Sequence, residues 1–85
     1  MVTIEFILNK EQTFIDCSKD DYIEDICKKF TREKNIINEE IIYLYKGRKL
    51  NLKKTFNYQI QKEDIKKNKM TILCIKKNKI NNNLN

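Results

Sequence analysis

The side chains in this sequence that could perform catalysis are three cysteines, twelve carboxylates and many lysines, and there is no histidine. Without histidine the chain has no Ser-His-Asp or Cys-His nucleophile system and no proton shuttle with a pKa near neutrality. Its single glycine, Gly47, excludes a phosphate-binding loop or a dinucleotide-binding turn, because both need several backbone positions without a Cβ atom. We therefore expect no enzymatic activity.

The cysteines Cys17, Cys27 and Cys74 are odd in number and widely spaced, and no two of them form a Cys-x-x-Cys pair. This spacing is typical neither of a disulfide framework nor of a zinc site. We interpret the three as reduced, small residues of the core. No metal and no other cofactor is expected.

Charge is distributed unevenly along the chain. Residues 1–40 carry a net charge of −4, and residues 41–85 carry a net charge of +10. A basic half of this kind favours binding to nucleic acid or to another anionic surface, which is one alternative function. Lysine, isoleucine and asparagine are also the residues that AT-rich coding favours, so base composition is a competing explanation for the excess.

The hydrophobic pattern predicts the elements that position these residues. Alternation of apolar and polar residues over residues 2–9 and 12–18 predicts a β-hairpin. Apolar residues at helical spacing from Ile23 to Phe30 predict an amphipathic helix over about residues 21–34, with a capping box from Ser18 to Asp21. Further strands are expected at residues 41–45, 49–50 and 70–75. A partly helical connection over residues 51–69 is expected to be anchored by Phe56, Tyr58, Ile60 and Ile65.

Together these elements predict one domain over residues 1–77, followed by a flexible tail rich in asparagine and lysine over residues 78–85. The sequence has no run of roughly 18 apolar residues and no basic-then-apolar start typical of a secretory signal. We expect a soluble protein located in the cytoplasm, with the nucleus as an alternative.

The order of these elements resembles that of the ubiquitin-like β-grasp fold, an α+β architecture in which a mixed sheet of four to five strands packs on one main helix. Residues 43–50, Tyr-Leu-Tyr-Lys-Gly-Arg-Lys-Leu, resemble the ubiquitin segment that carries the glycine turn between the third and fourth strands. Residues 55–63, Thr-Phe-Asn-Tyr-Gln-Ile-Gln-Lys-Glu, resemble a second ubiquitin segment with one residue deleted. The resemblance covers about residues 2–76.

Two departures from ubiquitin bear on function. The chain ends in Ile-Asn-Asn-Asn-Leu-Asn instead of the Gly-Gly that ubiquitin-like modifiers attach to lysine. Ile42 and Ile75 stand where ubiquitin has arginines used in activation. The resemblance therefore implies a domain that is not conjugated, unless the native chain continues to a Gly-Gly. Lys62 falls where ubiquitin is itself ubiquitylated, and Arg48 replaces a lysine at another such position, so an isopeptide bond at Arg48 is excluded.

The sequence also predicts a binding surface. If Ile41, Tyr43, Met70, Ile72 and Cys74 face the core, strict alternation directs their neighbours to the outer face of the sheet. In a β-grasp sheet the expected patch then consists of Ile7, Ile42, Leu44, Leu73 and Ile75. Leu44 and Leu73 lie where ubiquitin presents its two central aliphatic patch residues, and Thr71 replaces the patch histidine. A basic rim is expected from Lys46, Arg48, Lys49 and Lys76.

The main hypothesis is a non-conjugating ubiquitin-like module that binds a protein partner, in the ubiquitin pathway or in a larger assembly, through this patch. The first alternative is a ubiquitin-like modifier or carrier with a missing C-terminal Gly-Gly extension. The second is a basic-surface binder of nucleic acid or another anionic surface. Cover of the patch by the chain's own tail or by a neighbouring domain also remains open, as does addition of a partner strand to the edge of the second strand.

Overall fold

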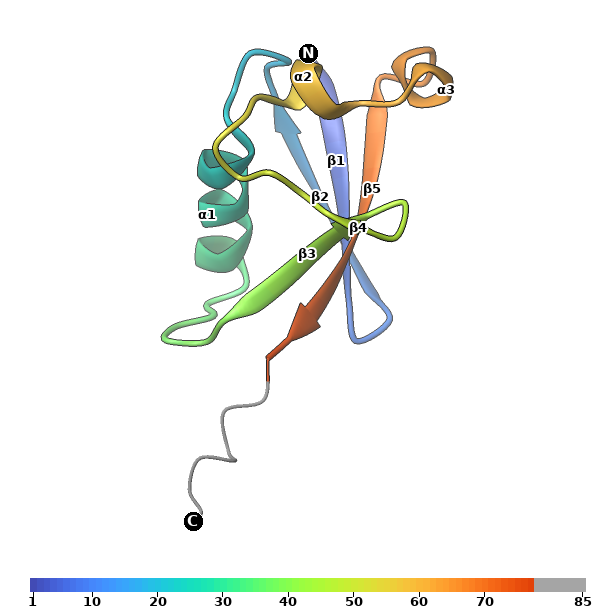
Figure 1. Cartoon of the computed structure of the whole chain (residues 1–85). Coiled ribbons are helices and arrows are strands. Elements are labelled where there is room, and N and C mark those ends of the chain that lie inside the picture. Colours follow the sequence, from blue (N-terminus) through green and yellow to red (C-terminus); the bar gives the residue numbers. More distant parts are fainter. Residues whose placement is uncertain (78–85) are drawn as a thin grey trace.

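The computed structural model describes residues 1–77, so the expected tail of residues 78–85 lies outside the described residues. The described part contains five strands, one long helix and two short ones (Figure 1). In chain order these are β1 Val2–Leu8, β2 Glu11–Cys17, α1 Ile23–Glu33, β3 Ile41–Tyr45, β4 Arg48–Lys49, α2 Phe56–Gln59, α3 Lys62–Ile65 and β5 Lys69–Lys76. No helix in this part of the chain is long and apolar enough to span a bilayer.

The five strands form one mixed sheet in the order β2-β1-β5-β3-β4. β1 pairs antiparallel with β2 and parallel with β5, while β3 pairs antiparallel with both β5 and β4. The helix α1 covers one face of this sheet (Figure 1). This architecture is the ubiquitin-like β-grasp fold, and it confirms the expected neighbours of β5.

The core lies between α1 and the inner face of the sheet. One stripe of α1 is buried, and it consists of Ile23, Ile26, Cys27 and Phe30. The Phe30 ring stacks on Phe6 of β1 with 4.4 Å between the ring centroids, and the Tyr43 ring meets Phe6 edge-on at 6.0 Å. These rings belong to three elements distant in sequence, so their contacts join the helix to the centre of the sheet.

The start of α1 differs from the expected capping box. The Asp21 carboxylate accepts the Ser18 N–H as predicted, but the helix begins at Ile23, with Tyr22 as an N-cap that makes no side-chain hydrogen bond. The free N–H groups of Ile23 and Glu24 are instead satisfied by backbone carbonyls of Lys54 and Leu52. The helix therefore starts two residues later than expected, because the long connection caps it.

The end of α1 is a Schellman motif centred on Asn35. The N–H of Ile36 donates to the carbonyl of Thr31 and the N–H of Asn35 donates to that of Arg32. Asn35 has a φ of 58°, a left-handed conformation that glycine usually provides. The same conformation occurs at Asn9, Asn38 and Asn68. Asparagine thus serves at left-handed positions in a chain that has only one glycine.

Replacing Asn35 by valine is expected to cost about 1–2 kcal/mol of stability, since a β-branched residue is poorly suited to the left-handed region. Asn35→Gly is the control, and it should leave stability unchanged or slightly raised. Urea unfolding followed by far-ultraviolet circular dichroism measures both. Equal stability of the two variants would contradict the role assigned to Asn35.

Further differences from the sequence predictions lie in and after β4. Lys46 and Gly47, both with positive φ, form the two-residue turn between β3 and β4. The short strand comprises Arg48 and Lys49, one residue earlier than expected. In the connection, Phe56 is buried and Ile60 packs against the core. Tyr58 and Ile65 are 68% and 51% exposed, so the prediction that they anchor this connection was wrong.

Candidate functional site

The strand register places the five aliphatic residues of the expected patch side by side on the face of the sheet opposite α1. Ile7 of β1 pairs with Leu73 of β5, and Leu73 pairs in turn with Leu44 of β3. In the next row Ile42 pairs with Ile75. The patch is therefore continuous across three strands. We call these residues the outer patch: Ile7, Ile42, Leu44, Leu73 and Ile75.

The outer patch is accessible to solvent on the described part of the chain. Leu73 and Ile75, on β5, are 48% and 43% exposed, and the other three members are half-buried. These exposed aliphatic side chains on one central strand leave apolar surface in contact with water. A binding partner would bury that surface, and this burial is favourable. Contiguous exposed apolar surface of a few hundred Å² is typical of interaction sites.

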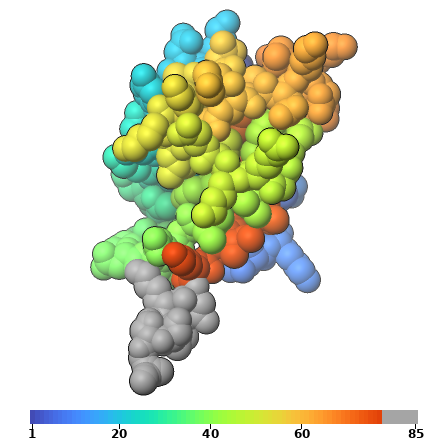
Figure 2. All heavy atoms as spheres, in the orientation of Figure 1, coloured from blue at the N-terminus to red at the C-terminus, as the bar shows by residue number. Residues whose placement is uncertain are grey.

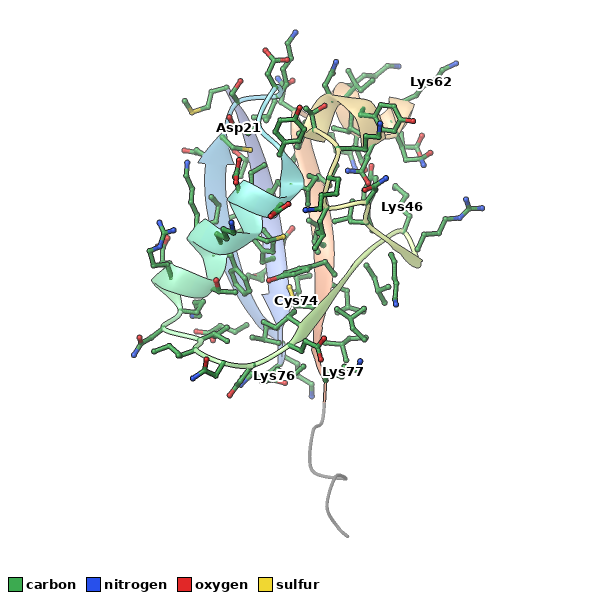
Figure 3. All side chains as sticks on the ribbon, turned by 60° about the vertical axis from the view of Figure 1, so that its left-hand side comes forward. Asp21, Lys46, Lys62, Cys74, Lys76 and Lys77 are labelled. Carbon is green, nitrogen blue, oxygen red and sulfur yellow. The ribbon has the colours of Figure 1, made fainter. Side chains whose placement is uncertain are left out.

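Of the four residues of the expected basic rim, two form salt bridges within the described residues and two do not. Lys46 lies near α3 and Lys76 at the opposite end of the sheet (Figure 3). Lys46 forms salt bridges with Glu63 and Asp64, and Lys76 forms one with Glu39. Arg48 and Lys49 are exposed on β4 and make no salt bridge within residues 1–77. The uncompensated positive charge at the patch therefore lies along β4.

Salt bridges also change the meaning of the charge asymmetry. Lysines of the basic half pair with carboxylates of the acidic half, and these pairs are Lys53 with Glu24, Lys69 with Glu5, Lys76 with Glu39 and Lys77 with Glu40. The fold thus mixes in space the charges that are separated in sequence. The exposed pairs among these contribute little stability each, but all four reduce the positive field that a polyanion would meet.

The outer face also contains a polar cluster that the sequence analysis did not identify. Glu5 points to this face but is only 6% exposed. Its carboxylate accepts hydrogen bonds from Gln12 and Thr71 and forms a 3.2 Å salt bridge with Lys69. Phe14, directly opposite Glu5 on β2, is 55% exposed and has the Lys69 ammonium above its ring. The cluster borders the outer patch, and only the strand register brings its members together.

The pKa of Glu5 shows that the cluster favours the ionised carboxylate. Burial raises this pKa, but the hydrogen bonds from Gln12 and Thr71 and the contact with Lys69 outweigh that effect, so the net pKa of Glu5 is lowered from its ordinary value. A lowered pKa in the folded state stabilises the fold above the unfolded pKa, and this contribution is lost as the pH falls through the folded pKa.

We therefore expect Glu5→Gln to lower stability at pH 7 and to have a smaller effect near pH 3. As the pH falls toward the lowered pKa of Glu5, the wild-type carboxylate becomes protonated and the charge that the cluster stabilises is progressively lost. Urea unfolding of both proteins at the two pH values measures the difference. If the difference in unfolding free energy between the two proteins is the same at both pH values, the charge of Glu5 is not what stabilises the cluster.

The three cysteines are free and buried in the described structure. Burial raises the pKa of Cys17 to about 11 and that of Cys27 and Cys74 to about 12. The thiols are therefore protonated at neutral pH and are weak nucleophiles. Their placement agrees with the interpretation of these residues as small members of the core.

The described residues thus form a domain with the ubiquitin-like β-grasp fold and an exposed aliphatic patch on the outer face of its sheet. No protein-family model matches the chain, and no curated protein matches it. Among solved structures, 203 chains match. One of them is described as the crystal structure of ATBAG1 in complex with HSP70, with a TM-score of 0.69 and 14% sequence identity. The match covers 89% of this chain but only 40% of that chain, and at this identity it shows the fold alone.

Proposed function

We propose that this chain is a non-conjugating ubiquitin-like module that binds a protein partner through the outer patch. The observation that supports this proposal most directly is the register of β1, β5 and β3, which makes five aliphatic side chains contiguous on a face without a helix. The matched ATBAG1 structure is a complex with HSP70, so the same fold occurs there in a protein that associates with another protein.

The non-conjugating role rests on two residues of the outer patch. Ile42 and Ile75 occupy positions at which the resemblance to ubiquitin places arginines used in activation. The two isoleucines pair with each other across β3 and β5. They extend the apolar surface at this end of the sheet and provide no guanidinium group for an activating enzyme to recognise.

Binding to nucleic acid is less well supported than binding to protein. Its motivation was the basic C-terminal half, and several of those lysines pair with carboxylates in the fold. Affinity that decreases steeply with salt would be the signature of a nucleic-acid site. A protein site centred on an aliphatic patch would show a much smaller salt dependence.

The test is a comparative pull-down from native lysate, analysed by mass spectrometry. The patch variant combines Leu73→Ser and Ile75→Ser, because these two side chains are exposed and their loss should leave the core intact. We expect proteins captured by the wild type to be lost with this variant. The matched control combines Ile37→Ser and Tyr58→Ser, two residues that are 66% and 68% exposed outside the patch. Equal capture by the wild type and the patch variant would refute the proposal.

A further inference from the structure

A small hollow opens beside β3, at the point where β4 no longer accompanies it. β4 pairs only with Leu44 and Tyr45, and the chain then turns away after the Leu50 N–H donates to the Tyr43 carbonyl. Figure 2 shows this side of the molecule, with β3 in green between the yellow-green segment after β4 and the orange-red end of β5. The hollow has a volume of about 230 Å³ and is lined by Glu40, Ile41, Ile42, Tyr43, Lys49, Leu50, Leu52 and Lys77.

The size and lining of the hollow suit one apolar side chain of a partner. Pockets for drug-sized ligands usually occupy about 300–1,000 Å³, and this one is smaller. Its walls include Ile42, Leu50 and Leu52, and Leu52 is 36% exposed at the rim. Filling such a pocket with an aliphatic or aromatic anchor is how a few residues supply most of the energy of a protein interface.

The charges around the hollow indicate the chemistry of the rest of the partner. Lys49 lines it, and Lys49 and its neighbour Arg48 have no salt bridge within the described residues. On the other side Lys77 is already paired with Glu40 at 3.7 Å. A partner carboxylate next to the apolar anchor would therefore meet an unpaired positive charge on the β4 side of the hollow. Such charge complementarity aids specificity and the rate of association.

Ile42 belongs both to this hollow and to the outer patch. A partner that lies on the patch can therefore reach the hollow without leaving the surface. We propose that the hollow receives a bulky apolar side chain from an acidic segment of the protein partner, with carboxylates of that segment facing Arg48 and Lys49. This inference rests on the proposed function, since it assumes that the outer patch is the docking face.

The test uses 12-residue peptides displayed on phage and selected against the full chain. We expect the selected sequences to share one leucine, isoleucine or aromatic residue next to aspartate or glutamate. A synthetic copy of a selected peptide should shift the amide resonances of Ile42, Lys49, Leu50 and Leu52 in a nitrogen-15 spectrum. Selection of no peptide, or of basic peptides only, would overturn the inference.

Two variants separate this inference from the proposed function. Leu52→Ser changes the hollow without touching the outer patch, and Leu73→Ser changes the patch without touching the hollow. We expect each substitution to lower the affinity for the peptide by about tenfold or more, which is the effect of losing one well-packed anchor contact. If only Leu73→Ser weakens binding, the hollow is not the anchor site and the proposed function stands. If only Leu52→Ser does, the outer patch is not the docking face.

Lys49→Glu tests the role of positive charge, and it should lower the affinity for the acidic peptide. Lys62→Glu, the same substitution on α3, should leave that affinity unchanged.

A competing occupant of the hollow is the chain's own segment of residues 78–85. In the nitrogen-15 spectrum of the free protein, removing residues 78–85 should leave the amide resonances of Ile42, Lys49 and Leu52 where they are in the full chain. If they move to new positions, the hollow is filled by the chain itself and the inference fails.

Discussion

Replacing Phe6 by alanine is expected to destabilise the domain by about 3–5 kcal/mol, the usual cost of truncating a buried phenylalanine. Phe6 is fully buried, stacks on Phe30 of α1 and meets the edge of Tyr43 of β3. The substitution therefore opens a cavity where the helix contacts two strands. A domain of this size has a total stability of about 4–12 kcal/mol, so the substitution should remove a large fraction of it.

Phe14→Ala is the matched control for this prediction, because it makes the same substitution in the same hairpin. Phe14 is 55% exposed on the outer face, and its loss should cost less than about 1 kcal/mol, mostly its contact with the Lys69 ammonium. Urea unfolding monitored by circular dichroism measures both proteins. Phe6→Leu serves if the alanine variant does not fold. Similar costs at the two positions would contradict this description of the core.

Asp64→Ala is expected to lower stability by about 1–3 kcal/mol, which is the cost of leaving a buried polar group without its partner. The Asp64 carboxylate is 7% exposed and accepts the hydroxyl hydrogen of Tyr45, itself buried at the end of β3. The Tyr45 oxygen also accepts the Gln61 N–H at 3.0 Å. Burial and the neighbouring Asp64 carboxylate raise the pKa of Tyr45 to about 12. This network attaches α3 to the sheet.

Glu63→Ala provides the comparison, since Glu63 is the preceding residue and shares the salt bridge to Lys46. Its side chain is 63% exposed, so its loss should cost about 0–1 kcal/mol. A double-mutant cycle with Tyr45→Phe then isolates the hydrogen bond, and a coupling of about 0.5–3 kcal/mol is expected. Additive effects of Asp64→Ala and Tyr45→Phe would mean that the two side chains do not stabilise each other.

The long elements were predictable because their signals are local and repeated. The helical spacing from Ile23 to Phe30 and the alternation over Val2–Leu8 gave the correct element types. Their ends were less accurate, since α1 begins where carbonyls of residues 52–54 meet its free N–H groups. That contact joins segments about thirty residues apart, and no local pattern encodes it.

The connection after β4 was harder to predict, because apolar character alone does not decide which side of a short helix is buried. Phe56 and Ile60 are four residues apart and face the core together, whereas Tyr58 lies between them and faces solvent. In α3 the buried residue is Asp64, whereas the apolar Ile65 is exposed. Hydrophobicity alone predicts that Ile65 is buried and Asp64 exposed, but the hydrogen bond between Asp64 and Tyr45 favours the opposite arrangement.

The sequence by itself determined the fold class, through the order of elements and the resemblance to ubiquitin, and alternation within single strands assigned the members of the outer patch to one face. Only the tertiary structure decided the state of the charged residues. Lys46 pairs with Glu63 and Asp64 of α3, and Lys76 pairs with Glu39, which precedes β3. Within the described residues Arg48 and Lys49 make no salt bridge, and Glu5 is buried among Gln12, Lys69 and Thr71. An ion pair forms between side chains that meet in space, so its partners are set by how the strands, helices and loops are placed in the fold, which residue types along the chain do not specify.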